Sequence, residues 1–153
     1  MTLTIAQESP LSVDAATLLN GSEAALRAAY DITECSSYNA EELNTDNIRF
    51  FVARMGGSPV GCVALCAEDG YAEIKRLFTT PNVRGRGVAK ALIAHLEEEA
   101  RAAGMARILL ESGSKLLAAV ALYDALGYAR RGPFGAYEQR DTTVFMEKAL
   151  SPC

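Results

Sequence analysis

Residues 71–90 read YAEIKRLFTTPNVRGRGVAK, and they decide the fold class of this chain. The hairpin signal Asp69-Gly70 comes directly before them and predicts a strand from Tyr71 to Thr79. Pro81 ends that strand, and apolar residues then recur at helical spacing from Val88 to Ala103. A strand that leads through a short basic loop into an amphipathic helix indicates one unit of a mixed α/β sheet.

Two earlier segments extend this unit into an antiparallel meander. Ile48 to Met55 and Val60 to Ala67 have strand composition, and the turn pair Gly56-Gly57 joins them. The other elements predicted from the pattern are a strand over Thr2 to Ala6, a helix over Val13 to Tyr30 interrupted at Asn20-Gly21, an irregular or short helical stretch over 31–47, a strand over Arg107 to Glu111, a buried helix over Leu116 to Leu126, a strand that opens at Tyr128 and a last strand over Thr143 to Lys148. This order predicts an α/β (α+β mixed sheet) fold covered by helices, with a parallel crossover within 71–112.

Length and composition favour one domain over residues 1–153. The chain has a formal net charge of −4 and is 50% hydrophobic, which excludes a disordered chain and argues against binding to nucleic acid or to an anionic membrane. We find no apolar run of 18 residues and no secretory signal, so we expect a cytoplasmic protein. The only histidine is His95 and the cysteines lack CxxC spacing, so no metal site is expected, and Cys62 and Cys66 are predicted to be small core residues.

The loop from Arg84 to Lys90 has the chemistry of an anion site. Its two glycines leave backbone N–H groups unshielded, and the helix that follows adds further N–H groups and the positive end of its dipole. Three cations and no acid lie in these seven residues, which favours a phosphate or pyrophosphate ligand. A Walker A motif is absent, the third glycine of a dinucleotide fingerprint is missing, and a solvated basic start of a helix remains the other interpretation.

A second motif, taken together with this loop, points to one protein family. The strand Glu73 to Thr79 and the loop Arg84-x-x-Gly87-x-Ala89 resemble the coenzyme A signature of the GCN5-related N-acetyltransferases (GNAT), and Leu122-Tyr123 through Gly127-Tyr128 resembles that family's LYxxxGF-type helix end. The resemblance covers about residues 48–148. It implies a GNAT-like acyl-CoA N-acyltransferase fold and acetyl-CoA as the acyl donor, and it is closest to small bacterial members of unassigned substrate.

The resemblance also implies roles for particular residues. It places the pyrophosphate of acetyl-CoA against Arg84, Gly85, Arg86, Gly87, Val88, Ala89 and Lys90, and the pantetheine arm along Leu77, Phe78 and Thr79. It implies that the strand carrying Leu77 splays from its parallel neighbour. In this interpretation Glu73 is the general base for the amine, an N–H of Leu77 or Phe78 stabilises the oxyanion, and Tyr123 protonates the leaving thiolate.

Each of these roles has a structural alternative. Glu73 could be an exposed strand residue paired with Lys75 or Arg76, and Tyr123 could be part of the helix packing. Glu111 and Tyr137 are candidates for binding the substrate amine, although a carboxylate at this position can cap a helix and a loop aromatic can be an anchor. The run Glu97-Glu98-Glu99 is predicted to be a solvated helix face, and His95 a surface residue.

The leading hypothesis is an acetyl-CoA-dependent N-acetyltransferase acting on a small-molecule, amino-acid or peptide amine by direct attack in a ternary complex. Leu116-Leu117 stands where relatives often carry a polar residue that bonds the pantetheine arm. This departure motivates the alternative of a coenzyme A-binding sensor or interaction module with little or no turnover. A nicotinamide-dependent enzyme is disfavoured by the meander before the loop. The resemblance leaves a homodimer open.

Overall fold

The computed structural model describes residues 2–30 and 40–151. The elements along the chain are β1 (Leu3–Gln7), α1 (Val13–Tyr30), α2 (Ala40–Leu43), β2 (Ile48–Met55), β3 (Ser58–Glu68), β4 (Tyr71–Thr79), a 3-10 turn (Pro81–Val83), α3 (Val88–Ala102), β5 (Arg107–Gly113), α4 (Leu117–Ala125), β6 (Ala129–Arg131) and β7 (Thr143–Ala149). The predicted order of strands and helices is therefore confirmed. The predicted stretch 31–47 contains α2, and its residues 31–39 lie outside the described part of the chain.

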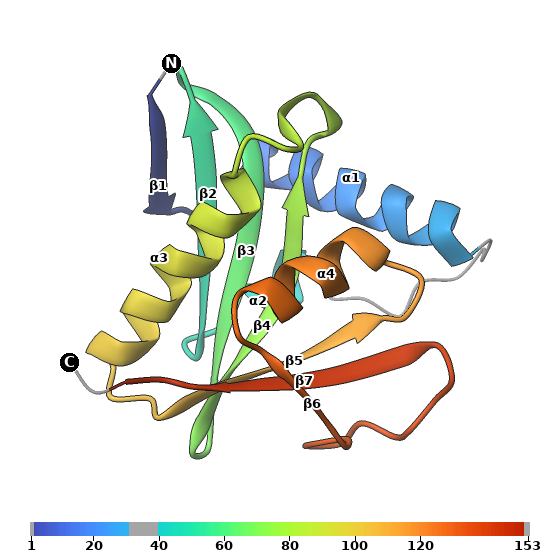
Figure 1. Ribbon diagram of the computed structural model, residues 1–153. Helices are drawn as coiled ribbons and strands as arrows, with labels where there is room; N and C mark the ends of the chain where they lie inside the picture. The colour runs from blue at the N-terminus through green and yellow to red at the C-terminus, as the bar shows by residue number, and fades with distance from the viewer. Residues whose placement is uncertain (1, 31–39, 152–153) are drawn as a thin grey trace.

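Seven strands form one sheet in the order β1-β2-β3-β4-β5-β7-β6. The meander β2-β3-β4 is antiparallel, and β4 pairs with β5 in parallel, as the sequence predicts. Helices cover both faces (Figure 1): α3 and α4 lie on the viewer's side, and α1 lies behind β3 and β4. The parallel crossover through α3 therefore joins the two central strands.

Alternating side chains of each strand fill two cores. On the α3 face, Val63, Ile74 and Leu110 join the helix stripe Val88, Leu92, Leu96 and Ala100 in the larger core. On the α1 face, Phe50 and Cys62 pack against Leu18 and Leu19 of α1. The predicted core positions Cys62 and Cys66 are both buried. No described helix has both the length and the apolar composition needed to cross a bilayer.

Two predictions about helices are wrong. The helix α1 continues through Asn20-Gly21 without interruption, because the ring of Phe78 packs on Gly21. A Cβ at position 21 would lie 2.8 Å from Phe78 Cζ, so the glycine admits the ring at that point. The helix α4 is not buried all round: Val120 and Tyr123 are buried, whereas Leu117 is 74% exposed. Its apolar composition hides the fact that it covers the sheet with only one side.

The acidic run on α3 is only partly the solvated face that the sequence predicts, because Glu98 is exposed and Glu97 is not. Glu97 is buried, where the Tyr128 hydroxyl donates to it at 2.9 Å and Lys148 Nζ contacts both of its oxygens at 3.1 Å. His95, predicted at the surface, is partly buried with its ring edge against Phe51. Glu97 thus joins α3 to the segment after α4 and to β7.

Candidate active site

The two central strands separate in the middle of the sheet. Parallel pairing between β4 and β5 covers only Ala72 with Ile108, Glu73 with Leu109, and Ile74 with Leu110. Beyond Ile74, the remaining residues of β4, through Thr79, no longer pair with β5. The predicted splaying of these strands is therefore present, and it opens a V-shaped gap in the backbone of the sheet.

A bulge in β4 marks the point where the strands part. Lys75 pairs with Ala64 and Phe78 pairs with Cys62, so Arg76 and Leu77 together face the single residue Val63. Arg76 has a φ of 60°, the left-handed region that residues with a side chain rarely adopt. The bulge turns the backbone of Leu77 and Phe78, the predicted pantetheine and oxyanion residues, relative to the rest of the strand.

The basic loop lies beyond the same end of β4. Gly85 and Gly87 both have φ of 82°, and Gly87 is the N-cap of α3. The N–H groups of Arg84 and Arg86 donate to Pro81 O and Val83 O within the turn. Because the first helical hydrogen bond runs from Ala91 N–H to Gly87 O, five N–H groups donate no bond within the described residues: those of Gly85, Gly87, Val88, Ala89 and Lys90.

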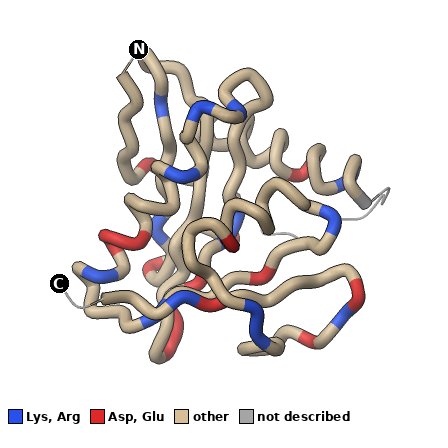
Figure 2. Tube along the Cα trace, in the orientation of Figure 1, with Lys and Arg blue, Asp and Glu red and all other residues tan. Residues whose placement is uncertain are grey.

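This loop fits a polyanionic ligand. The side chains of Arg84, Arg86 and Lys90 are exposed, and Figure 2 shows Lys and Arg along the loop and the first turn of α3. A Cβ at Gly85 or Gly87 would meet no atom within 4 Å, so the space above the loop is open. Close by, Thr80 Oγ1 is buried without a hydrogen-bond partner in the described residues, an unmet polar atom that the sequence did not single out. Backbone donors, cations and open space together suit the pyrophosphate of a coenzyme A.

Glu73 lies on the α1 face of β4 inside a small polar network. Its side chain is 6% exposed, and it forms an ion pair of 3.1 Å between Oε2 and Lys75 Nζ. The hydroxyl of Tyr137 donates to the same Oε2 at 2.6 Å and accepts from Lys75 Nζ at 2.9 Å. Glu73 is therefore paired, as one alternative held, but it is buried and not an exposed strand residue.

The other carboxylate oxygen of Glu73 can still accept a hydrogen bond. Its Oε1 makes no hydrogen bond within the described residues and is not among the buried atoms that lack a partner. The pKa of Lys75 is raised, because its bonds to Tyr137 and Glu73 outweigh the opposing effect of its burial. Burial, with the Glu73 charge, also raises the pKa of Tyr137. Lys75 is thus charged and Tyr137 neutral at ordinary pH.

Tyr123 lies in the core on the opposite face of the sheet. It is buried, belongs to the same core as Val88 and Ile74, and packs edge-to-face on Tyr128 with ring centroids 5.6 Å apart. Burial raises its pKa, so the phenol stays protonated at neutral pH. Glu73 and Tyr123 therefore lie on opposite faces of the sheet.

Glu111 and Tyr137 lie on the same face as Glu73. Tyr137 comes from the loop before β7 and is anchored by Phe134 and Phe145, while Glu111 is exposed on β5. The pKa of Glu111 is raised, first by the protein atoms around its carboxyl group and then by the charge of Glu73. Leu109, two residues before Glu111 on β5, pairs with Glu73, so Glu111 lies near the network.

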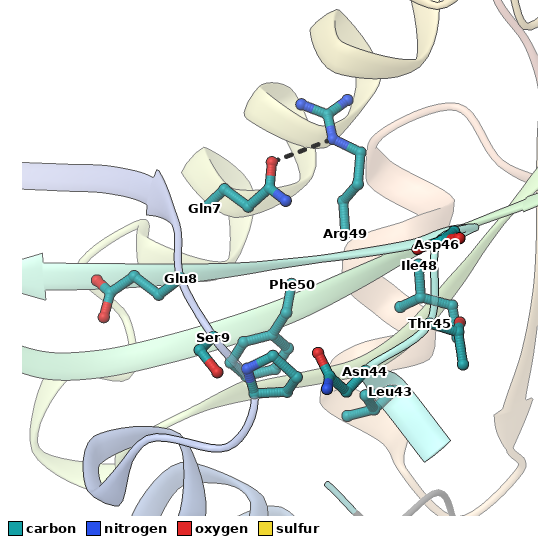
Figure 3. A pocket seen from close by; sticks show the side chains of 11 residues that line it. Gln7, Glu8, Ser9, Leu43, Asn44, Thr45, Asp46, Ile48, Arg49 and Phe50 are labelled. Atoms are coloured by element: carbon teal, nitrogen blue, oxygen red, sulfur yellow. Dashed lines mark hydrogen bonds between the residues drawn. The ribbon is translucent and has the colours of Figure 1, made fainter. Parts of the chain in front are cut away.

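A hollow in the described surface lies apart from this network. It has a volume of about 520 Å³ and lies between the end of β1, the start of β2 and α2, with Leu43 and Phe50 in its wall. Figure 3 shows two of its lining residues, Gln7 and Arg49, turned toward each other, with a hydrogen bond of 3.3 Å. Ile48 in the wall pairs with Cys66, which pairs with Glu73, so the hollow is two strands to the side of the network.

Splayed central strands, the sheet order and the basic loop at the start of α3 together define the acyl-CoA N-acyltransferase fold. The chain belongs to the Acetyltransferase (GNAT) family, whose sequence profile matches residues 17–128. It is 40% identical to an IAA acetyltransferase of Azospirillum brasilense over 150 residues, which cover 97% of this chain and 98% of the relative. The sequence-based assignment to this family is confirmed.

Solved structures support the same fold assignment. A Klebsiella pneumoniae protein assigned as an acyl-CoA N-acyltransferase is 31% identical, has a TM-score of 0.81, and covers 98% of this chain and 99% of its own. The PaiA N-acetyltransferase of Thermoplasma acidophilum, solved with coenzyme A, shares the fold at a TM-score of 0.78 and 18% identity, with 98% of this chain and 100% of its own covered. The protein is an acetyl-CoA-dependent N-acetyltransferase, and the predicted acyl donor is confirmed.

Proposed function

We propose that the chain transfers the acetyl group of acetyl-CoA directly to a primary amine of a small molecule, amino acid or peptide, in a ternary complex. The observation that carries this proposal is the joint placement on β4 of a buried carboxylate and, past the bulge, the free end of a splayed strand. Acetyl-CoA supplies an acetyl thioester, and the five unpaired N–H groups from Gly85 to Lys90 would hold its pyrophosphate.

In the proposed reaction Glu73 accepts the proton of the acceptor ammonium at Oε1, directly or through water. The neutral nitrogen then forms the new C–N bond at the thioester carbonyl carbon, and an N–H of Leu77 or Phe78 stabilises the charge that develops on the carbonyl oxygen. As the C–S bond breaks, the electron pair leaves with sulfur, and the protonated Tyr123 supplies the proton that makes the free thiol. The nitrogen loses its second proton to water as the amide forms, and Tyr123 regains a proton from solvent. No covalent bond to the protein is needed, which is consistent with a site built without a histidine.

The experiment is a thiol-release assay with acetyl-CoA across amines, amino acids and aminoglycosides. We expect Glu73→Gln to lower kcat by about a hundredfold or more, the range of a lost general base, and to leave coenzyme A binding intact. Binding is read from unfolding, because ligand at a hundred times its Kd adds about 2.7 kcal/mol of stability. The exposed Glu98→Gln is the matched control and should act like the wild type.

Two outcomes would contradict the proposal. If coenzyme A at millimolar concentration leaves the unfolding transition unmoved, the loop does not bind it. If it binds but no amine in the panel releases thiol, and Glu73→Gln and Tyr123→Phe change nothing, the chain is the coenzyme A-binding sensor that the Leu116-Leu117 departure motivates.

A further inference from the structure

The candidate base, Glu73, lies beside the positively charged side chain of Lys75. Glu73 and Lys75 are two residues apart on β4, so their side chains project from the same face of the strand. Both side chains are largely removed from water, at 6% and 11% exposure, and the ion pair between them is 3.1 Å long. The Tyr137 hydroxyl links the two groups, since it donates to Glu73 and accepts from Lys75. The contacts of both partners hold the Glu73 oxygen Oε2.

A lone carboxylate would oppose the reaction at this point. An alkyl amine arrives as an ammonium ion, because its pKa is near that of lysine, about 10. A buried carboxylate beside an ammonium ion stabilises the charged form and raises the pKa of the amine further. The nitrogen can attack only after it has lost a proton. The charge that attracts the acceptor would therefore also hold it in its unreactive form.

We propose that Lys75 offsets the charge of Glu73, so that an acceptor amine at Oε1 loses its proton to water, by way of Glu73, more easily than it would beside an unpaired carboxylate. The inference deepens the proposed N-acetyltransferase function and rests on it. With the acceptor at Oε1 and Lys75 at Oε2, two cations face one carboxylate, and their repulsion favours the neutral amine. Lys75 acts through Glu73 and is therefore a positioning residue.

Within the described residues, the groups that face Lys75 are Glu73, Tyr71 and Cys66 of the β3-β4 hairpin, Glu111 of β5 and Tyr137 of the last loop, with Glu68 acting on Tyr71 and Cys66 and Arg140 acting on Glu111. The pKa of Tyr71 and of Tyr137 is raised, and that of Cys66 is raised to about 12, so all three stay neutral below pH 9. Among these described groups, Glu111 is a carboxyl group whose pKa is raised, and its contribution is tested with Glu111→Gln.

The test is the acid limb of the kcat profile against pH, at saturating acetyl-CoA and acceptor. This limb reports the ionisation in the bound complex that must be complete before attack. In Lys75→Met we expect it to move up by about two pH units, the size of one like charge at roughly 6 Å and an effective dielectric constant of about 20. Activity lost at neutral pH should then return at higher pH, a rescue that a merely structural defect would not show. Lys75→Arg keeps the positive charge, so its acid limb should lie at the same pH as that of the wild type.

Lys148 provides a matched control. It too is a largely buried lysine that pairs with a glutamate, Glu97, beside a tyrosine hydroxyl, that of Tyr128. Lys148→Met should lower stability and leave the limb where it is. A series of acceptors with different solution pKa values shows which group the acid limb reports. The pH of the limb follows the pKa of the acceptor only if the acceptor amine itself is titrating.

Lys75→Gln is the second variant, should Lys75→Met fail to fold, because its neutral amide can still donate to Tyr137 and Glu73. Its acid limb should also move up. A limb that does not move in either neutral variant, or one that moves equally in Lys148→Met, would overturn the role of Lys75. Turnover with an unmoved limb contradicts only this inference, whereas no turnover with any amine contradicts the proposed function as well.

Discussion

Arg76 holds an unfavourable backbone conformation at the point where the sheet opens. With a φ of 60° it is the only residue other than glycine in residues 2–30 and 40–151 with a positive φ, a conformation that costs roughly 1 kcal/mol or more. Cys62 Sγ donates to Arg76 O at 3.5 Å, and parallel pairing with β5 has stopped two residues earlier, at Ile74. The strained residue thus lies between the candidate base Glu73 and the predicted pantetheine segment Leu77 to Thr79. There it changes the direction of the strand.

Gly61 pairs with Thr79 just beyond this bulge, and a methyl group at Gly61 should disturb the neighbouring Phe78 backbone. A Cβ at Gly61 would lie 3.0 Å from both Phe78 O and Leu92 Cδ1 and 3.2 Å from Val88 Cγ1. Because one of these atoms is backbone, we expect Gly61→Ala to cost about 1–3 kcal/mol, the usual range for overpacking. The displaced Phe78 backbone should also weaken acetyl-CoA binding.

Urea unfolding with and without coenzyme A measures both effects of Gly61→Ala. Gly132→Ala is the control, because a Cβ there meets nothing within 4 Å and the glycine has no positive φ. We expect the control to stay within about 0.5 kcal/mol of the wild type, as surface substitutions usually do. An equal loss in the two variants would show that the contact at Gly61 has no special weight.

At the scale of elements, α3 is bounded by two glycines of the same geometry. Gly87 before the helix and Gly104 after it both have φ of 82°, and a Cβ at either would meet no atom within 4 Å. Alanine at either position should therefore cost about 1–2 kcal/mol of backbone strain and nothing in steric contact. Only Gly87 lies among the unpaired N–H groups of the loop.

The pair Gly87→Ala and Gly104→Ala thus separates stability from ligand binding. We expect both variants to lose similar stability, and we expect only Gly87→Ala to weaken coenzyme A binding, by about tenfold, because the αL turn that aims the loop N–H groups is disturbed. Isothermal titration with coenzyme A measures the second effect. Equal affinities in the two variants would rule out the loop as the pyrophosphate site.

The elements that the sequence predicted well are those with local causes. The strands Ile48–Met55 and Tyr71–Thr79 follow from composition and from the glycine turns beside them, and the stripe on α3 follows from helical spacing. Glu97 was assigned to solvent because its partners, Tyr128 and Lys148, come 31 and 51 residues later. Helical spacing alone could not show that a polar cluster would cover that side of α3.

The same reasoning applies to the candidate site. The loop at the start of α3 and the acid Glu73 could be found from sequence, because each belongs to a motif. The environment of Glu73 could not, since Tyr137 reaches it from 64 residues away and a pattern cannot show which strand residues a loop will bury. Lys75 was foreseen as a pairing partner, and only the bond to Tyr137 and the low exposure indicate a role in the chemistry.

For the molecule as a whole, the proposed site would need access from both faces of one sheet. Glu73, Glu111 and Tyr137 lie on the α1 face, and Tyr123 of α4 lies in the core on the α3 face. A continuous sheet would keep these groups apart, because its hydrogen-bonded backbone forms a wall between the faces. The splayed β4 and β5 remove that wall only beyond Ile74, so the rest of the sheet keeps its cores intact.

Both cores hold protons that the unfolded chain would release in base, so the folded state should lose stability as pH rises above about 9. Burial raises the pKa of Cys62 and Cys66 to about 12, from an ordinary value of 9.0, and it raises the pKa of Tyr123 and Tyr128 from 10.0. Above pH 9 the unfolded state binds fewer protons than the folded state, so the slope of the unfolding free energy against pH is negative. Each such group contributes about 1.4 kcal/mol per pH unit between its two pKa values.

Urea midpoints should therefore change little between pH 7.5 and 8.5 and fall steeply from pH 9 to 11. The cysteine thiols of the unfolded chain ionise first, and the tyrosines, which ionise at higher pH, make the loss of stability steeper. Absorbance of tyrosinate near 295 nm provides a second measurement, in which Tyr123 and Tyr128 ionise only as the chain unfolds. Tyr128→Phe loses the bond to Glu97 and starts from a lower stability, but its slope above pH 10 should be shallower by the contribution of one group. A midpoint that stays constant to pH 11, or full tyrosinate absorbance in a still folded chain, would mean that water reaches these hydroxyls and thiols inside the cores.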